Sequence, residues 1–487
     1  MIQIHPKDTV AVALHPITKG TCQSGITALE DIPSGHKMAL KPIARAENII
    51  KYGVSIGHAT ADIVPGAWVH THNMATNLSG EMTYTYAPKP VSLQSLPAAT
   101  FRGYRREDGK VGIRNEIWII PAVGCVNDVA KALAAENQDL VQENIDGLYA
   151  FPHPYGCSQT GEDHARTRKL LAALAGHPNA GAVLVLHLGC ENLTKAQFLE
   201  ELGDFDSRRI HFVTCQEVED EMDAGRKALE ACAAYANQFS REGIPISELI
   251  VGMKCGGSDG LSGITANPVV GAFSDLLIAQ GSSAVLTEVP EMFGAEGMLL
   301  NRCIDVTVFQ KATDMLNGFK AYFLAHNETV YENPSPGNKE GGITTLEEKS
   351  CGCVQKGGTA PIVDVIGYGD RIQRKGLHLL DGPGNDLVSA TALTAAGVHM
   401  VLFTTGRGTP FGAPAPTIKI ATNTPLAIKK STWIDFNAGT VADGSKTIGE
   451  AAQELLEYVL QVASGKQTKA EEKGYREIAV FKGGVTL

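Results

Sequence analysis

The stretch IWIIPAVGC (117–125) contains the pattern that decides the fold of this chain: a short apolar run, rich in β-branched residues, that ends on a cysteine. Four later stretches repeat the pattern: LYAFPHPYGC (148–157), AVLVLHLGC (182–190), IHFVTC (210–215) and ELIVGMKC (248–255). Each run has the length of a buried strand, and the polar stretch after it is typical of the start of a helix. Alternating strands and helices form parallel sheets, which place all strand carboxyl ends along one edge. The five runs therefore predict an α/β protein in which several thiols reach one ligand-binding crevice.

Three of these cysteines are predicted metal ligands. Cys157, Cys190 and Cys255 stand in loops of glycine and polar residues, YGCSQTG, LGCEN and KCGGSDG. The alternative for any single free cysteine is packing as a small apolar side chain, which Cys215 and Cys232 fit better. Recurrence at the junction of strand and loop favours a thiolate-bound metal, and with it a metal-dependent enzyme.

The composition limits the class of protein. The chain has 487 residues, more than one hydrophobic core usually supports, so two or three domains are expected. Ten cysteines without a visible secretory signal predict reduced thiols and a cytoplasmic protein. The net charge of −11 provides no electrostatic basis for binding nucleic acid, and no apolar run is long enough for a membrane span. An acidic substrate must therefore be bound by locally placed cations or by a metal.

Changes in composition divide the chain into three predicted domains. Residues 1–92 contain short alternating segments broken by glycine and proline, which predicts a compact all-β module. The proline-bearing stretch 86–100 is typical of an extended linker. Residues 101–245 carry the strand–helix units, and residues 246–487 add further strands and helices with long polar loops.

The polar loops of the last domain supply the candidate substrate-binding residues. KCGGSDGLSGITANP (254–268) precedes a predicted helix, and the amino end of a helix favours anions. FTTGRGTPFG (403–412) presents an arginine between glycines, and arginine binds a carboxylate through two parallel hydrogen bonds. A surface turn is the alternative for each loop, since turns favour the same residue types. The predicted substrate-binding residues are Arg407, Ser258, Asp259, Asn267 and Lys419.

Two histidines in VHTHN (69–73) are predicted acid–base residues. In a strand, alternation places His70 and His72 on one face, where such a pair binds a divalent metal or transfers protons. The alternative is a pair of half-exposed histidines that are hydrogen-bonded in a turn. Lys254 and Glu288, which stand at the ends of two other predicted strands, complete the predicted catalytic set.

Motifs spread over the whole chain carry a family resemblance: GHKMAL, IIKYGVSIGHA, VHTHN, VGIRNEIWIIPAVGCVN, HPYGCSQ, LGCEN, CGGSDGLSGITANP, EVPEMFGAE, NPSPGNKEGG, TGRGTPFG and PTIKIATN. On these motifs the chain resembles the altronate/galactarate dehydratase family. The resemblance implies an N-terminal SAF (β-clip) domain followed by two α/β domains. It implies dehydration of a sugar acid to a 2-keto-3-deoxy acid, with iron as Fe²⁺ or in a labile Fe–S cluster, and with Mn²⁺ as a substitute. A homo-oligomer is expected.

The IIKYG and VHTHN forms favour the altronate branch, in which D-altronate becomes 2-keto-3-deoxy-D-gluconate, with galactarate as the alternative substrate. Such a reaction needs a base for the weakly acidic C2 proton, a cation beside the enediolate and an acid for the departing C3 hydroxyl. Two other classes stay open from the residues, an Fe–S redox protein and a non-catalytic sugar-binding protein. The lack of a C-x₂-C-x₂-C run argues against the first, and the Cys, His, Lys and Glu residues in loops argue against the second.

Overall fold

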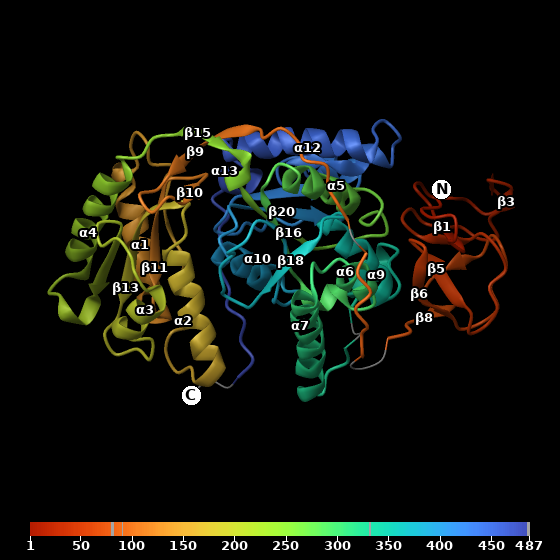
Figure 1. Cartoon of the computed structure of the whole chain (residues 1–487), viewed down its shortest axis with the longest axis horizontal. Coiled ribbons are helices and arrows are strands. Elements are labelled where there is room, and N and C mark those ends of the chain that lie inside the picture. Colours follow the sequence, from red (N-terminus) through yellow and green to blue (C-terminus); the bar gives the residue numbers. More distant parts are fainter. Residues whose placement is uncertain (79–81, 90, 331–332, 485–487) are drawn as a thin grey trace.

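The computed structural model of the chain describes residues 1–78, 82–89, 91–330 and 333–484. Figure 1 shows three bodies in a row. We call them the β-module (residues 1–78, right), the C-terminal domain (residues 246–484, centre) and the middle domain (residues 100–245, left). The chain passes from the β-module across the C-terminal domain to the middle domain before it returns to build the centre (Figure 1).

The β-module consists of short strands and tight turns. Its strands are β1 (Val10–Val12), β2 (Cys22–Gln23), β3 (Ile26–Thr27), β4 (Lys37–Ala39), β5 (Asn48–Lys51), β6 (Val54–Ala59), β7 (Trp68–Val69) and β8 (Met74–Ala75). They form antiparallel sheets in the orders β1-β4-β7 and β5-β6-β8, with β2 and β3 as a separate hairpin. Val10, Ile49, Ile56 and Val69 belong to its small apolar core. The predicted all-β fold is confirmed.

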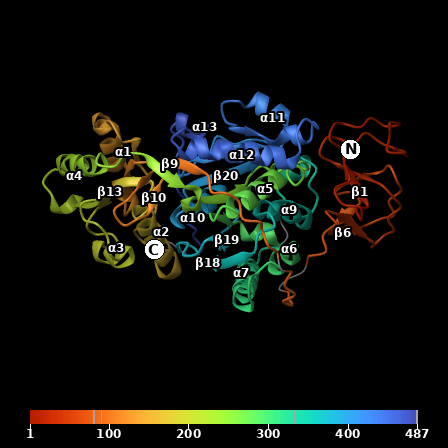
Figure 2. The ribbon, with the colours of Figure 1, turned by 45° about the horizontal axis from the view of Figure 1, so that its top comes forward.

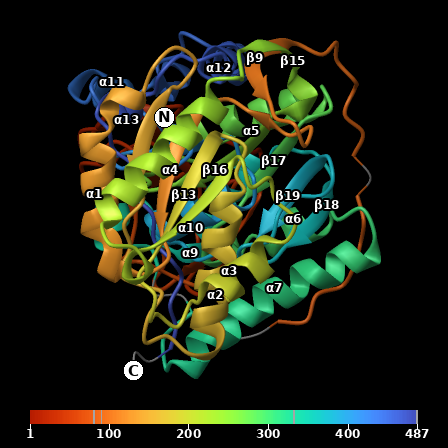
Figure 3. The ribbon, with the colours of Figure 1, turned by 90° about the vertical axis from the view of Figure 1, so that its left-hand side faces the viewer.

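The middle domain is a parallel sheet with helices on both faces. Its elements are β9 (Thr100–Arg105), β10 (Val111–Gly112), β11 (Glu116–Pro121), η1 (Gly124–Val126), α1 (Asn127–Glu136), η2 (Gln138–Leu140), β12 (Gly147–Ala150), α2 (Gly161–Ala175), β13 (Ala180–His187), α3 (Lys195–Leu202), β14 (Ile210–Thr214), η3 (Cys215–Glu217), α4 (Glu221–Ala236) and β15 (Glu242–Pro245). The parallel strands have the order β12-β11-β13-β14. Trp118 and Ile120 pack with α2 and α3, whereas Ile117 and Ile119 pack with α1 and α4. Figure 3 shows these four helices around the sheet. This burial on both faces explains the unbroken apolar run of β11.

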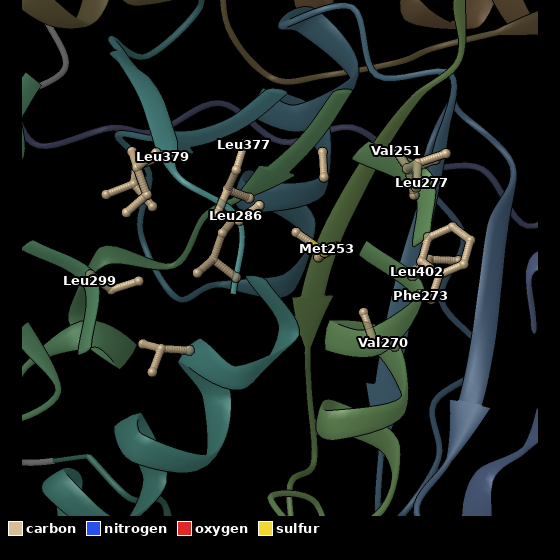
Figure 4. Packing of buried hydrophobic residues seen from close by; sticks show 14 of the residues in the cluster. Val251, Met253, Val270, Phe273, Leu277, Leu286, Leu299, Leu377, Leu379 and Leu402 are labelled. Carbon is tan, nitrogen blue, oxygen red and sulfur yellow. The ribbon is translucent and has the colours of Figure 1, made fainter. Parts of the chain in front are cut away.

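The C-terminal domain is built around a seven-stranded sheet. Its elements are η4 (Ile246–Glu248), β16 (Ile250–Cys255), α5 (Ala266–Ile278), β17 (Ser283–Leu286), η5 (Val289–Met292), α6 (Glu296–Leu300), α7 (Val306–Ala325), α8 (Pro336–Glu340), α9 (Leu346–Cys353), η6 (Val354–Gly357), β18 (Ile362–Ile366), β19 (Gly376–Leu380), α10 (Asp386–Ala395), β20 (Met400–Thr405), β21 (Thr417–Ala421), α11 (Thr424–Lys429), β22 (Phe436–Asn437), η7 (Ala438–Val441), α12 (Ile448–Ala463) and α13 (Lys469–Glu472). The strand order is β18-β19-β17-β16-β20-β21-β22, and all the pairs are parallel. Figure 4 shows Met253 and Leu402 of the sheet in one core with Val270 and Phe273 of α5. Burial of each such side chain contributes about 1.5–3 kcal/mol to folding.

The five predicted strands are confirmed, but they do not form one sheet. Four of them are β11, β12, β13 and β14 of the middle domain, whereas the fifth is β16 of the seven-stranded sheet. The chain leaves the middle domain through β15. This strand pairs antiparallel with β9 in a separate small sheet, so the next strand, β16, does not join the parallel sheet of the middle domain. Several of the thiols do share one sheet edge, as predicted, since Cys125, Cys157 and Cys190 follow the neighbouring strands β11, β12 and β13, but Cys255 does not join them. Cys255 lies at the edge of a different sheet from Cys157 and Cys190.

The β-module packs beside α9, and Figures 1 and 2 show this neighbourhood from two directions. The segment between the β-module and β9 has no helix or strand among its described residues, as predicted for a linker. It lies along the C-terminal domain, where the Tyr86 hydroxyl donates to the Cys303 carbonyl at 2.9 Å and the Leu96 N–H donates to the Ala279 carbonyl at 3.0 Å. Within the described ranges, no helix is both long enough and apolar enough to cross a bilayer.

Candidate active site between the β-module and the C-terminal domain

Two thiols and one carboxylate form a buried cluster in the C-terminal domain, which we call the Cys–Glu–Cys cluster. Cys255 ends β16, Glu291 lies in η5, and Cys353 ends α9. The Glu291 Oε2 atom lies 2.9 Å from the Cys255 Sγ and 3.1 Å from the Cys353 Sγ, and the two sulfurs are 3.4 Å apart. Sulfurs bound to one tetrahedral ion lie about 3.8 Å apart, because each metal–sulfur bond is about 2.3 Å long. The three donor atoms therefore fit a single divalent ion, with a position left for another ligand.

Three buried lysines balance the acidic groups around this cluster. The Lys349 Nζ lies 2.8 Å from Glu291, and the Nζ atoms of Lys254 and Lys356 lie 2.9 and 3.6 Å from Glu288. Burial acts to raise the pKa of Glu291, but Lys349 and Lys356 lower it to about 2. Burial and the neighbouring Glu291 raise the pKa of Glu288. Glu291 is therefore the carboxylate that is kept anionic and available to a metal.

Lys254, a predicted catalytic residue, is a fixed cation. Its Nζ lies 2.6 Å from Asp386 Oδ1, in addition to its contact with Glu288, and its side chain is completely buried. Burial acts to lower the pKa of Lys254, but Glu288 and Asp386 raise it. A permanently charged ammonium group stabilises a developing anion and does not accept a proton at neutral pH.

A second buried ion cluster attaches the β-module to α9. Glu348 accepts hydrogen bonds from the Nζ atoms of Lys37 at 2.7 Å and Lys51 at 2.8 Å. Burial acts to raise the pKa of Glu348, but the two lysines lower it to about 2. Burial lowers the pKa of Lys37 to about 8. Because Glu348 precedes Lys349 in α9, the attachment of the β-module lies directly beside the Cys–Glu–Cys cluster.

The predicted strand face carrying His70 and His72 is wrong, because both residues lie in a turn. The alternative of two half-exposed histidines holds only for the turn, since His70 is buried and His72 is exposed. The His70 N–H donates to Asn73 Oδ1 at 2.9 Å, and the Asn73 N–H donates to the His70 carbonyl, so β7 ends at Val69. His70 is buried against the C-terminal domain with its Nδ1 3.0 Å from Thr344 Oγ1, whereas His72 is exposed. Burial lowers the pKa of His70 to about 4, so this imidazole is neutral at pH 7.

A cleft of about 520 Å³ lies between the β-module and the C-terminal domain, a volume within the usual range for small-molecule sites. His15 lines it from the β-module, and Asp259 and Arg407 line it from the C-terminal domain. The Arg407 Nη1 donates to the Gly337 carbonyl at 2.9 Å and to Glu340 Oε2 at 2.7 Å. The arginine is half-exposed, so the guanidinium can exchange the exposed Glu340 for the carboxylate of a ligand.

Asp259 lies between this cleft and the Cys–Glu–Cys cluster. It also lines a small cavity of about 10 Å³, roughly the space of one water molecule, together with Ser258, Lys349 and Cys353. The Ser258 hydroxyl is buried and has no hydrogen-bond partner within the described part of the chain. A buried hydroxyl of this kind is expected to bond a ligand or water. The cavity and the cleft thus connect the predicted Ser258 and Asp259 to a site close to Cys353.

The other two predicted substrate-binding residues have structural partners. Both polar atoms of the Asn267 amide are already hydrogen-bonded, to the Gly352 carbonyl at 3.0 Å and to the Thr404 hydroxyl at 2.7 Å. Lys419 is completely buried in β21 near Asp435, and burial lowers its pKa to about 8. In the ranges that the structure describes, neither side chain lines the cleft.

Cys157 and Cys190 lie outside this site, exposed at the carboxyl edge of the middle-domain sheet. No second trio of metal-ligating atoms among the described residues is as closely spaced as the Cys–Glu–Cys cluster.

Sequence reasoning gave no role to Cys353, Glu348 or His15, and it placed Glu291 in the same strand-end loop as Glu288 without choosing it as a site residue. Cys353 stands in the helical segment EEKSCGC, where a cysteine is typical of packing, and its partner Cys255 is 98 residues away. Glu291 follows Glu288 within one turn of the chain, and only the fold shows which of the two carboxylates contacts the thiols. The motif EVPE (288–291), which places two carboxylates three residues apart at a strand end, was the one sequence signal for Glu291.

Comparisons with known proteins agree with this architecture. The sequence models of three family domains match: the altronate/galactarate dehydratase SAF domain at residues 1–77, the second domain of D-galactarate dehydratase/altronate hydrolase at 103–237, and the C-terminal domain of D-galactarate/altronate dehydratase at 246–486. The altronate dehydratases of Escherichia coli (strain K12) and Bacillus subtilis (strain 168) are 51% and 50% identical, over all of this chain and 99% of each relative. The galactarate dehydratase (L-threo-forming) of Escherichia coli (strain K12) is 36% identical over 99% of this chain and 96% of its own length.

Together, the three-part fold and these similarities define an enzyme of the hydro-lyase class, and the Cys–Glu–Cys cluster is its candidate metal site. The chain belongs to the D-galactarate/altronate dehydratase family, and its β-module is the SAF domain of that family.

Proposed function

We propose that this enzyme dehydrates D-altronate to 2-keto-3-deoxy-D-gluconate. The observation that carries the proposal is the difference in identity: 51% and 50% to two altronate dehydratases over the full chain, but 36% to a galactarate dehydratase. Galactarate is the second candidate substrate, supported by the same three domains.

The proposed metal is iron, as Fe²⁺ with Mn²⁺ as a substitute, held by Cys255, Glu291 and Cys353. Two thiolates and a carboxylate are a donor set that suits a divalent transition metal. When bound there, the metal supplies Lewis acidity for a substrate oxygen. This proposal replaces the expected use of Cys157 and Cys190 at the same ion, because those thiols belong to another sheet.

The proposed substrate position is the cleft between the β-module and the C-terminal domain. Arg407 holds the sugar-acid carboxylate through two parallel hydrogen bonds and gives up its contact with Glu340. Ser258 binds a substrate hydroxyl, since its own hydroxyl has no partner among the described residues. Asp259 lines the cleft, but its carboxylate already accepts hydrogen bonds from Ser262 and Thr422, so its role there is to hold the loop of Ser258. Asn267 and Lys419 keep these loops and strands in place.

The reaction breaks two bonds of the substrate. A base removes the C2 proton, the C3–O bond breaks, and the departing hydroxide takes a proton and leaves as water. The enol that remains gains a proton at C3, loses the proton of its C2 hydroxyl to solvent and becomes the 2-keto acid. We assign the proton acceptor to the β-module wall of the cleft, where His15 is the titratable side chain among the described residues. The buried ammonium group of Lys254, held by Glu288, stabilises negative charge near the cluster.

His70 and His72 remain predictions as catalytic residues, and the contact of His70 with Thr344 supports a role for His70 in docking the β-module. The homo-oligomeric state and the cytoplasmic location also remain predictions.

Product analysis tests the proposed function. The purified chain is loaded with Fe²⁺ without oxygen, and the 2-keto-3-deoxy acid formed from D-altronate and from galactarate is quantified. Faster conversion of altronate supports the proposal, whereas faster conversion of galactarate supports the second candidate. The absence of product from both acids would exclude the proposed reaction.

A further inference from the structure

Two adjoining cavities lie between the middle domain and the C-terminal domain, and we call them the seam cavities. Helices α2 and α10, which carry lining residues of the smaller cavity, pack against each other there (Figure 1). The larger cavity has a volume of about 290 Å³ and the smaller about 180 Å³. Lys110 and Arg371 line both, so the two cavities meet at these side chains.

The seam cavities lie at the opposite sheet edge from the candidate active site. Arg209 precedes β14, Ile250 begins β16 and His399 precedes β20, so these lining residues stand at the amino ends of parallel strands. Cys255 ends β16 and Arg407 follows β20, which places the Cys–Glu–Cys cluster and the cleft at the carboxyl ends. A ligand in the seam cavities is therefore separate from the substrate in the cleft.

Three arginines, Arg106, Arg209 and Arg371, line the larger cavity. Their hydrogen bonds with described residues go to neutral acceptors: Arg106 to the Pro178 carbonyl at 2.9 Å, the Arg114 carbonyl at 2.8 Å and Asn115 Oδ1 at 2.7 Å, Arg209 to the His177 carbonyl at 2.6 Å and the Ala180 carbonyl at 2.9 Å, and Arg371 to the Ala173 carbonyl at 2.8 Å. The turn between α2 and β13 thus accepts hydrogen bonds from both Arg106 and Arg209, which places two guanidinium groups close together.

Most acidic residues at the larger cavity are already paired with other cations. Their ion pairs are Asp108 with Lys110 at 2.6 Å, Asp206 with Arg208 at 2.7 Å, and Glu107 with Arg208. The fourth acidic residue, Asp204, is exposed to solvent. Within the described part of the chain, the three arginines of the cavity therefore have no ion pair of their own.

Arg209 gives the most specific indication of a ligand. Its side chain belongs to a residue that is 8% exposed, and its Nε has no hydrogen-bond partner among the described residues. Burial lowers the pKa of Arg209, and burial together with Arg209 lowers the pKa of Arg106 to about 9. Buried N–H donors are nearly always hydrogen-bonded, and buried charges are usually paired. The free donor and the unbalanced charge both indicate an anion.

We infer that the larger seam cavity binds a small oxyanion, phosphate or carboxylate, between Arg209 and Arg371. Guanidinium groups bind either anion through paired N–H donors. Arg106 adds positive charge, since most of its N–H groups already bond protein acceptors. The smaller cavity, with apolar lining residues such as Ile250 and Ile372, takes the uncharged part of a larger ligand.

The bound oxyanion connects two domains. Arg209 belongs to the middle domain, whereas Arg371 lies between β18 and β19 of the C-terminal domain. An anion that contacts both guanidinium groups reduces their repulsion and stabilises the contact between the domains. The inference goes beyond the proposed function and does not depend on it.

Isothermal titration calorimetry of the full chain with inorganic phosphate and with malonate tests the inference, with chloride at equal ionic strength as the reference. All proteins carry Arg407→Gln, so that the arginine of the cleft does not contribute. We expect binding of at least one of the two anions, and the tighter one identifies the recognised group. Arg209→Gln and Arg371→Gln should each weaken this binding about tenfold or more, because hydrogen bonds to a charged group are lost.

A matched control and a second variant keep the result specific. Arg105→Gln removes an exposed arginine of β9 and should keep the affinity. Arg371 makes a single hydrogen bond with described residues, so Arg371→Gln decides the test if Arg209→Gln does not fold, as checked by circular dichroism. The absence of binding for both anions, or an equal affinity in folded Arg371→Gln, would overturn the inference.

Discussion

Lys51 of the β-module and Glu348 of α9 form an ion pair of 2.8 Å in which both side chains are 1% exposed. Lys37 contacts the second oxygen of the same carboxylate at 2.7 Å. The next residue of α9, Lys349, contacts Glu291 in the Cys–Glu–Cys cluster. Helix α9 therefore contacts the β-module through Glu348 and the Cys–Glu–Cys cluster through Lys349. A shift of the β-module would move α9 and with it the cluster.

Replacing Glu348 with glutamine should destabilise the protein strongly. The change leaves the ammonium groups of Lys37 and Lys51 buried without an anion, and loss of one partner of a buried pair typically costs about 3–5 kcal/mol. Urea unfolding measures the free energy. Glu242→Gln, which breaks an exposed pair with Arg105, is the control and should have little effect. Equal stability of the two variants would contradict the role given to Glu348.

The iron content of the protein should depend on the Cys–Glu–Cys cluster. Cys255→Ser, Cys353→Ser and Glu291→Gln should each weaken iron binding at least about tenfold, since even an outer-shell partner of a metal typically contributes that much. A chelator should abolish turnover, and added Fe²⁺ should restore it. Metal analysis of protein prepared without sulfide measures the effect.

Cys351→Ser is the matched control for these variants. It alters a buried thiol two residues before Cys353, whose sulfur lies 3.9 Å from the Gly294 carbonyl and does not belong to the cluster. Normal iron content and turnover in all the cluster variants would show that the metal is bound elsewhere.

Arg407→Lys should impair the use of substrate although it keeps the positive charge. Lysine cannot form the two parallel hydrogen bonds of the guanidinium, and hydrogen bonds to charged groups are worth about 1.5–3 kcal/mol, which corresponds to a loss of roughly 10- to 100-fold in kcat/KM. Arg105→Lys, an exposed change in the middle domain, serves as control. Steady-state kinetics measure the effect. An unchanged kcat/KM in Arg407→Lys would show that Arg407 does not bind the substrate.

The buried His70 should make the protein less stable in acid. A histidine of the unfolded chain binds a proton below about pH 6.5, whereas burial lowers the pKa of folded His70 to about 4. Between these values the unfolded state binds more protons, so the free energy of unfolding decreases as the pH falls from 6.5 to 4. His70→Gln should remove roughly 1–3 kcal/mol of that decrease.

Thermal unfolding at several pH values measures this effect as the difference between variant and unaltered protein, because burial lowers the pKa of His153 and His399 as well. His72→Gln should keep the unaltered pH dependence, since His72 is exposed. The same pH dependence in His70→Gln would mean that His70 is not buried in neutral form.

Local pattern predicted much of the fold, and long-range contacts decided most of the site. The apolar run of β11 predicts a strand because both faces of that strand are buried, and the same holds for β13 and most of β16, whereas β12 and β14 are partly exposed. The sheet to which a strand belongs depends on long-range pairing. The antiparallel pairing of β15 with β9, which separates β16 from the middle-domain sheet, is an example that no local pattern signals. The position of Arg407 at the cleft was predictable from its glycine-flanked loop at a strand end, and its role in binding substrate stays a prediction. The place of Cys353 in the cluster could not be predicted, because its sulfur lies 3.4 Å from that of Cys255 only in the folded chain, and the two residues are far apart in the sequence.

The most direct test of the central claim is the fate of D-altronate in D₂O, followed by NMR with the iron-loaded enzyme and without oxygen. We expect 2-keto-3-deoxy-D-gluconate that carries one deuterium at C3, because the C2 proton is lost to a base and C3 is protonated from solvent. Galactarate should be consumed more slowly. Transfer of the C2 hydrogen to C3 without deuterium would contradict the mechanism. Faster consumption of galactarate would contradict the assigned substrate, and no product from either acid would contradict the proposed activity.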